Sequence, residues 1–218
     1  FSEGDKGIWE VQDALPLGTD IKTVYDLEDT IFEVDNKSLT NRPDLWCHYG
    51  IAREISAILD RPLRPIVTEN LQYYAQNGMV DIDVQSDNCY RYSALKVGNV
   101  TKKVSPIGVE IRLFYCGMRA INLLADITNY VMLDVGQPMH AFDGDKVKNI
   151  QVKDVRGEVE FQTLDGEKRI LPTDSCVICS NNQPVAVAGV MGGLDSEITD
   201  NTKILLLESA CFDPTSIR

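Results

Sequence analysis

Only two histidines occur in the 218-residue sequence, so acid–base catalysis near neutral pH has few candidates. His140 lies in the segment Gly136-Gln-Pro-Met-His-Ala-Phe-Asp143, which combines glycine, proline, an amide, an imidazole and a carboxylate. Irregular backbone of this composition often positions functional side chains, and a structural turn explains the same residues equally well. His48 falls in an amphipathic helical stretch, where a structural role is the favoured interpretation.

Other polar or glycine-rich positions are candidates of a different kind. Thr128 and Asn129 precede the His140 segment, and a polar helix face is their favoured interpretation. Gly192 and Gly193 allow another group to approach the backbone closely and to bind its N–H groups, although the segment lacks the spacing of a phosphate-binding loop. Glu208 follows an apolar run, where a carboxylate lies either at the exposed end of a strand or buried against a partner.

The six cysteines are scattered along the chain, which is typical of reduced, cytosolic thiols and predicts a cytoplasmic protein. Only Cys176 and Cys179 have the spacing of metal ligands, and no second cysteine or histidine pair stands at a zinc-site distance. Because β-branched residues separate them, a buried strand is the favoured interpretation over a metal or redox site. No Ser-His-Asp arrangement is visible.

The formal net charge of −12 argues against a basic surface for nucleic acid, so the chain alone is expected to bind RNA weakly. Phosphate contacts would have to come from basic residues flanking the stretch between Arg119 and Lys146, namely Arg91, Lys96, Lys102, Lys103 and Arg112. No apolar run is long enough to span a membrane, and the first residues do not resemble a signal peptide, so neither a membrane protein nor a secreted one is expected.

Hydrophobic periodicity predicts helices from Pro43 to about residue 59, after Ser105-Pro106, and over 124–131. Alternation and turn residues predict strands at 7–11, 31–34, 80–84, 92–97, 159–164, 168–171, 176–179, 185–190 and 204–207. This pattern favours an α+β fold, with helices packed on layered mixed β-sheets in a three-layer, sandwich-like arrangement. A small, mostly helical portion at residues 1–70 is expected to precede a second domain at 71–218.

Several motifs resemble the bacterial phenylalanyl-tRNA synthetase beta subunit, and in particular its central tRNA-editing (B3/B4) domain. They are Leu39-Thr-Asn-Arg-Pro-Asp44, Gly50-Ile-Ala-Arg-Glu54, Arg119-Ala-Ile-Asn122, Asp126-Ile-Thr-Asn-Tyr-Val-Met-Leu133, Gly136-Gln-Pro-Met-His-Ala-Phe-Asp143, Ala188-Gly-Val-Met-Gly-Gly-Leu-Asp-Ser-Glu197 and Leu207-Glu-Ser-Ala-Cys-Phe-Asp213. The motifs follow one another in order, and the resemblance covers most of the chain. The resemblance implies hydrolysis of tyrosine wrongly esterified to the phenylalanine tRNA.

The resemblance also assigns roles to residues. Glu208 is implied to accept a hydrogen bond from the tyrosine hydroxyl, and a site built for that hydroxyl can disfavour the analogue lacking it by about 10⁴. Gly192 is implied to form a backbone wall, with N–H groups near Gly193 donating to substrate. Four further positions are implied to border the ester and the tRNA 3′ end and to serve catalysis: His140, Arg119, Thr128 and Asn129.

Hydrolysis by this scheme needs a positioned water and donors to the oxyanion, and it requires no metal. His140 is one candidate to orient or deprotonate the water, and the substrate's own ribose hydroxyl or amine is another. For the whole synthetase the resemblance implies ATP and magnesium, tRNA(Phe), and an alpha subunit in a heterotetramer.

The sequence departs from the family pattern at Leu123, where a second asparagine is usual, and near Gly108, where a tryptophan is common. The family continues past residue 218 into a Thr/Ser-Asp-Ala-Ser segment that helps to complete the editing pocket. We therefore expect a C-terminally truncated piece of the subunit that cannot make aminoacyl-tRNA by itself. Two alternatives to an editing hydrolase stay open: a non-catalytic structural or tRNA-positioning module, and an unrelated metal or redox protein centred on Cys176 and Cys179.

Overall fold

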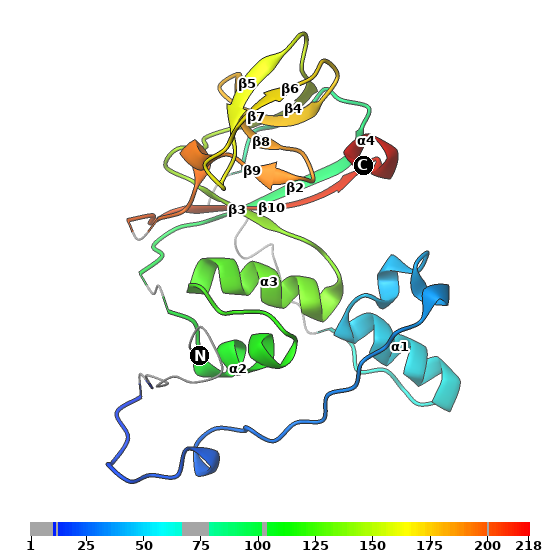
Figure 1. The fold of residues 1–218 in the computed structure, drawn as a ribbon, viewed down its shortest axis with the longest axis vertical. Helices are drawn as coiled ribbons and strands as arrows, with labels where there is room; N and C mark the ends of the chain where they lie inside the picture. Colours follow the sequence, from blue (N-terminus) through cyan, green and yellow to red (C-terminus); the bar gives the residue numbers. More distant parts are fainter. Residues whose placement is uncertain (1–10, 12, 67–78, 102–103, 200) are drawn as a thin grey trace. The chain divides into compact units, whose positions relative to one another are not determined.

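A computed structural model describes residues 11, 13–66, 79–101, 104–199 and 201–218 of the chain. Contacts between residues divide the chain into two compact units. The first unit comprises residues 1–51 and 102–136, and the second comprises residues 52–101 and 137–218. Figure 1 labels the α-helices and most of the strands of both units.

The first unit contains a pair of packed helices, α2 (Ile107–Tyr115) and α3 (Leu123–Val135). Asn122 caps α3 by accepting hydrogen bonds from the backbone N–H groups of Leu124 and Ala125. Gly136 ends the helix in the left-handed conformation, with φ of +79°, which glycine adopts without strain. Sequence analysis predicted both helices, and the structure confirms them.

The N-terminal segment consists mainly of short helical turns. They are η1 (Ile21–Thr23), η2 (Lys37–Leu39) and η3 (Pro43–Leu45), followed by helix α1 (His48–Leu59). The helix predicted from Pro43 is therefore interrupted between η3 and α1. The strand predicted at 31–34 is wrong, because this stretch forms no regular structure and is exposed. The strand predicted at 7–11 lies almost entirely outside the described residues.

The second unit is built from β-strands in three sheets. A five-stranded sheet has the order β1-β4-β7-β8-β9, a three-stranded sheet has the order β2-β10-β3, and β5 and β6 pair with each other. All described pairings are antiparallel except that of β1 with β4. The strands are β1 (Ile82–Val84), β2 (Cys89–Val97), β3 (His140–Asp143), β4 (Ile150–Asp154), β5 (Val159–Gln162), β6 (Lys168–Leu171), β7 (Cys176–Ser180), β8 (Gln183–Val187), β9 (Met191–Gly192) and β10 (Leu205–Phe212). The unit also contains two short helices, η5 (Leu194–Ser196) and α4 (Pro214–Ile217), and residues 52–59 of α1.

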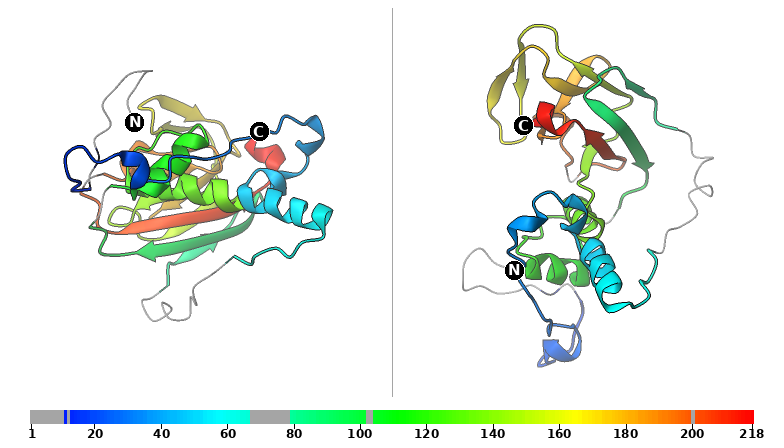
Figure 2. Two further views of the ribbon diagram at one scale, coloured as in Figure 1. Left: turned by 90° about the horizontal axis from the view of Figure 1, so that it is seen from below. Right: turned by 90° about the vertical axis from the view of Figure 1, so that its right-hand side faces the viewer.

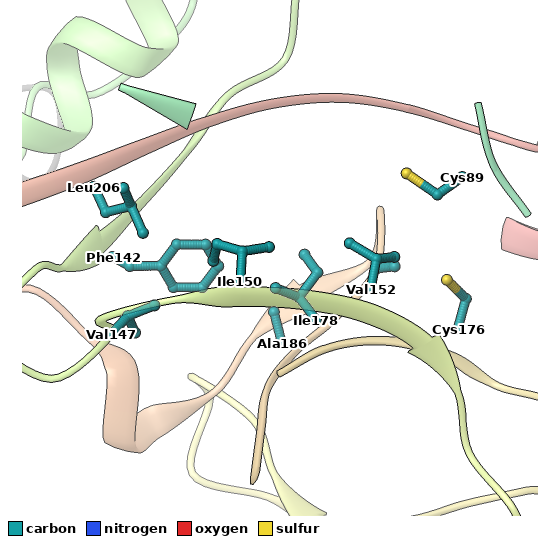
Figure 3. Packing of buried hydrophobic residues seen from close by; sticks show 10 residues of the cluster. Cys89, Phe142, Val147, Ile150, Val152, Cys176, Ile178, Ala186 and Leu206 are labelled. Atoms are coloured by element: carbon teal, nitrogen blue, oxygen red, sulfur yellow. The ribbon is translucent and has the colours of Figure 1, made fainter. Parts of the chain in front are cut away.

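The five-stranded and three-stranded sheets enclose a hydrophobic core. Phe142 of β3 and Leu206 of β10 face Ile150 of β4 and Ile178 of β7, and all four are at most 2% exposed. Figure 3 shows these side chains pointing toward one another. The long strands β2 and β10 lie side by side along this core (Figure 2). Packing of this kind fixes the direction in which side chains on β10 point.

A smaller core lies on the other face of the five-stranded sheet, where Phe161 and Leu171 of the β5–β6 hairpin pack on Val177 and Cys179 of β7. Because both faces of β7 are covered, every residue of the strand is buried. The second unit is therefore a stack of three β-layers. The predicted packing of helices on the sheets stays a prediction.

The mixture of helices and sheets confirms the predicted α+β class. The predicted domain boundary at residues 70–71 lies outside the described residues, and a division at that point stays a prediction. Contacts place α2 and α3 in the first unit, whereas the domains predicted from the sequence, 1–70 and 71–218, put both helices in the second. No helix in the described part of the chain is long and apolar enough to cross a membrane.

Candidate functional site

Glu208 and His140 are brought face to face by the pairing of their strands. In the antiparallel ladder between β10 and β3, Glu208 is directly opposite His140, and Leu206 is opposite Phe142. Because side chains alternate along a strand, Glu208 lies on the same face of β10 as Leu206, which belongs to the core. The sequence had left open whether Glu208 is exposed or buried, and the structure shows it only 7% exposed.

Burial changes the acidity of Glu208. Loss of water raises the pKa of the Glu208 carboxyl from its ordinary 4.5 to about 7, although the nearby hydroxyl of Tyr92 opposes this change. Its Oε2 atom has no hydrogen-bond partner among the described residues. A buried carboxylate oxygen without a partner is costly, and such atoms are frequent at functional sites.

His140 is held between an aromatic ring and a glycine. Its imidazole meets the Phe142 ring edge-on, with the ring centroids 4.5 Å apart. A Cβ atom built on Gly192 would lie 2.7 Å from two ring atoms of His140, so a larger residue at that position would force the imidazole to move. Burial also lowers the pKa of His140, which keeps the imidazole neutral near pH 7 and able to accept a proton.

Leu164 completes this group from the β5–β6 hairpin. Its backbone N–H donates to the Gly192 carbonyl at 3.0 Å, and its Cδ1 would lie 3.0 Å from a Cβ on Gly192. The turn that carries Leu164 is fixed by Asp165, which accepts hydrogen bonds from the Arg169 guanidinium and from the Thr163 hydroxyl. We call Tyr92, His140, Leu164, Gly192 and Glu208 the Glu208 cluster.

Gly193 is engaged in packing within the second unit. Its N–H donates to the Val185 carbonyl at 2.8 Å, and a role of Gly193 in substrate binding stays a prediction. A Cβ at this position would lie 2.7 Å from the Phe161 ring. Gly193 therefore lets the hairpin pack closely on the sheet.

Three predicted catalytic residues, Arg119, Thr128 and Asn129, belong to the first unit. The Thr128 hydroxyl donates to the Ala125 carbonyl at 2.8 Å within α3. Asn129 follows it on the helix and is half-buried, and Arg119 is exposed between α2 and α3. Their participation in the site with His140 stays a prediction.

The alternative metal or redox site at Cys176 and Cys179 is not formed. Cys176 lies in the core between the sheets, whereas Cys179 lies in the core under the hairpin, so the two thiols are on opposite faces of β7. The described residues contain no group of three or more side chains that could hold a metal ion. His48 has a structural role, since its Nδ1 lies 2.9 Å from the Leu133 carbonyl oxygen.

Sequence reasoning missed two members of the cluster, Tyr92 and Leu164. Tyr92 had been recognised only as part of a strand, and its alternation with Ala94 could have placed both on one face. Leu164 gave no signal, because the hairpin reaches β9 through tertiary contacts: the bridge between Thr163 and Gly193 and the Leu164 N–H bond to the Gly192 carbonyl.

Comparisons with known proteins agree with this arrangement of motifs. The family model for the B3/4 domain matches residues 88–218. The phenylalanine–tRNA ligase beta subunit of Aquifex aeolicus is 39% identical over 219 residues, covering 100% of this chain and 28% of that protein. The corresponding subunit of Desulfotalea psychrophila is 43% identical and is covered over 27% of its length.

A crystal structure of an N-terminal fragment of the phenylalanyl-tRNA synthetase beta subunit from Pyrococcus horikoshii aligns with a TM-score of 0.48 and 17% identity. The alignment covers 91% of this chain and 65% of that one. The chain spans about a quarter of the length of the curated relatives named above. The predicted resemblance is confirmed by the family model and by these relatives, and the chain belongs to the B3/4 domain family.

Proposed function

We propose that this chain is the editing part of a phenylalanine–tRNA ligase beta subunit and hydrolyses the ester of tyrosine mischarged onto tRNA(Phe). The proposal is carried by Glu208 Oε2, which is buried without a hydrogen-bond partner among the described residues, on the strand opposite His140, whose ring lies against Gly192. A buried carboxylate that lacks a partner can accept a hydrogen bond from the hydroxyl of tyrosine, whereas phenylalanine offers it no hydrogen bond. Membership of the B3/4 domain family and the named relatives support the same conclusion.

His140 has the properties of a base in this reaction. Its neutral imidazole can accept a proton from a water as the water attacks the ester carbonyl, and general base catalysis of this kind typically contributes about 10²–10⁴-fold. The imidazolium then returns this proton to the ribose oxygen as the ester C–O bond breaks, which releases tyrosine and leaves a free hydroxyl on the 3′-terminal ribose. Arg119, Thr128 and Asn129 would contact the ester and the tRNA end, while Gly192 leaves room for the imidazole.

The whole protein would act with an alpha subunit in the cytoplasm and would use ATP and magnesium in the synthetic reaction, outside this chain. The tRNA would supply the 3′ end that carries tyrosine. Since the chain has a net charge of −12, its affinity for tRNA is expected to come chiefly from the remainder of the enzyme.

The test is deacylation of tyrosyl-tRNA(Phe) and phenylalanyl-tRNA(Phe) by the chain and by its His140→Ala variant. We expect turnover of the tyrosyl ester, and a loss of about 10²-fold or more in the variant with tyrosine binding retained. Binding of tyrosine by the wild-type chain with no turnover would identify a non-catalytic recognition module. If the chain shows neither binding nor turnover, a structural or tRNA-positioning role is favoured.

A further inference from the structure

Tyr92 shares a face of the three-stranded sheet with Glu208. In the ladder between β2 and β10, Ala94 is opposite Glu208 and Tyr92 is opposite Ala210. Tyr92 is therefore the diagonal neighbour of Glu208, and such neighbours lie within reach of a long aromatic side chain. The ring of Tyr92 packs against the core between the sheets, which leaves its hydroxyl as the polar end of an otherwise apolar contact.

Two polar atoms in this small region are buried without a partner. Neither the Tyr92 hydroxyl nor Oε2 of Glu208 has a hydrogen-bond partner among the described residues. The two groups lie close enough to influence each other's protonation, since the charge of Glu208 adds to burial in raising the pKa of Tyr92. The Tyr92 hydroxyl approaches the carboxyl closely enough to lower the pKa of Glu208, but the geometry of the pair falls short of a full hydrogen bond. Folded proteins seldom leave two neighbouring buried polar atoms unpaired, so these two are expected to take a polar partner from outside the chain.

The chemistry of the two atoms defines what the guest must present. The ionised carboxylate only accepts hydrogen bonds, whereas the phenol of Tyr92 can donate one. A hydroxyl group satisfies both, because it donates one hydrogen bond and accepts another. An aryl amine can donate to the carboxylate but accepts poorly, and a methyl ether accepts but cannot donate.

We propose that Tyr92 is a second specificity-determining residue of this site: its phenol donates a hydrogen bond to the hydroxyl oxygen of a bound tyrosine, while that hydroxyl donates to Oε2 of Glu208. The inference rests on the proposed function. Glu208 and Tyr92 together require the bound side chain to donate one hydrogen bond and to accept another. This requirement favours a hydroxyl over other polar groups and over the bare hydrogen of phenylalanine.

The test compares binding of free L-tyrosine and L-phenylalanine to the full 218-residue chain and to its Tyr92→Phe variant, by calorimetry at about pH 8. Phenylalanine at position 92 keeps the ring that packs on the core and removes only the hydroxyl. We expect the variant to bind tyrosine about two- to tenfold more weakly, as the loss of one hydrogen bond predicts, and to bind phenylalanine as the wild type does. Tyr90→Phe is the matched control, because Tyr90 is exposed on the same strand and its hydroxyl contacts Asp213.

A second measurement needs no variant. The wild-type chain is expected to bind L-tyrosine several-fold more tightly than either 4-amino-L-phenylalanine or O-methyl-L-tyrosine. Two results would overturn the role of Tyr92 and leave the proposed function standing. One is that the wild-type chain binds 4-amino-L-phenylalanine as tightly as L-tyrosine. The other is that the wild-type chain prefers tyrosine over phenylalanine and Tyr92→Phe shows the same preference. If the wild-type chain shows no preference for tyrosine over phenylalanine, the proposed function fails and the inference fails with it.

Discussion

Glu208 and His140 occupy directly opposed positions on neighbouring antiparallel strands, and burial shifts their pKa values in opposite directions. The pKa of the carboxyl rises and that of the imidazole falls, so burial favours the neutral form of each group. Near neutral pH the imidazole is therefore neutral and the carboxyl is close to its pKa of about 7, so the two side chains are not held together as an ion pair. A small change in surroundings, such as a bound hydroxyl, is enough to alter the charge of Glu208.

Replacing Glu208 by glutamine should change how stability depends on pH. Because the pKa of Glu208 in the folded protein lies above the ordinary 4.5, its contribution to stability is full below about pH 4.5 and is lost as the pH rises to about 7. Over that interval, the wild-type chain should lose up to about 3 kcal/mol of unfolding free energy relative to Glu208→Gln. Denaturant unfolding of both proteins at about pH 4.5 and pH 8 measures the difference.

Glu197→Gln is the control for this comparison, because Glu197 is exposed. Its substitution should leave the pH dependence of stability close to that of the wild type. If the unfolding free energies of the wild type and Glu208→Gln change with pH in parallel, Glu208 titrates normally. Burial would then not raise its pKa.

Gly192→Ala should impair hydrolysis by moving His140. The added methyl group would lie 2.7 Å from the imidazole ring, and the ring, as the end of a side chain, is what must shift. Displacement of a catalytic group typically costs about tenfold or more in turnover. Gly98→Ala provides a matched change in the same unit, because a Cβ there meets nothing within 4 Å. Full turnover by Gly192→Ala would mean that His140 does not need its present position.

Preference for tyrosine should increase with pH. A hydrogen bond to an ionised acceptor is about twice as strong as one between neutral groups, and Glu208 becomes ionised as the pH passes its pKa of about 7. The ratio of L-tyrosine to L-phenylalanine affinity should therefore rise between about pH 6 and pH 8 in the wild type. Glu208→Gln should show a small ratio that does not change with pH, and a wild-type ratio that stays flat would count against recognition by the carboxylate.

Metal removal should leave the chain unaffected. Cys176 and Cys179 face different cores, so they cannot bind one ion together without unfolding β7. Hydrolysis after treatment with EDTA should equal that of untreated protein, and elemental analysis should find less than one zinc per chain. Stoichiometric zinc, released together with loss of structure, would revive the metal-site hypothesis.

Much of the fold could be predicted because local patterns and tertiary packing agree. Helix α3 has an apolar stripe, an asparagine cap and a terminal glycine, and the β5–β6 hairpin has Asp165-Gly166 at its turn. The strand predicted at 31–34 failed because its apolar residues find no partner strand and stay exposed. Strand β3 was taken for irregular backbone, since its ladder partner β10 is more than sixty residues away in sequence.

The site could be predicted from the sequence only as a set of residues. Family resemblance indicated His140, Gly192 and Glu208, and the structure brings these three together within the second unit. Two properties depend on tertiary packing and escaped the sequence: the burial of Glu208, which raises its pKa, and the engagement of the Gly193 N–H by Val185. Tyr92 escaped for the same reason, because a diagonal pair needs the register of two distant strands.

The central claim is that Glu208 selects tyrosine for hydrolysis, and the most direct test is the ratio of deacylation rates for tyrosyl-tRNA(Phe) and phenylalanyl-tRNA(Phe) under single-turnover conditions. We predict that the wild-type chain favours the tyrosyl ester and that Glu208→Gln reduces this ratio by about tenfold or more while the rate for the phenylalanyl ester stays within about twofold. An unchanged ratio in a folded Glu208→Gln protein would contradict the claim.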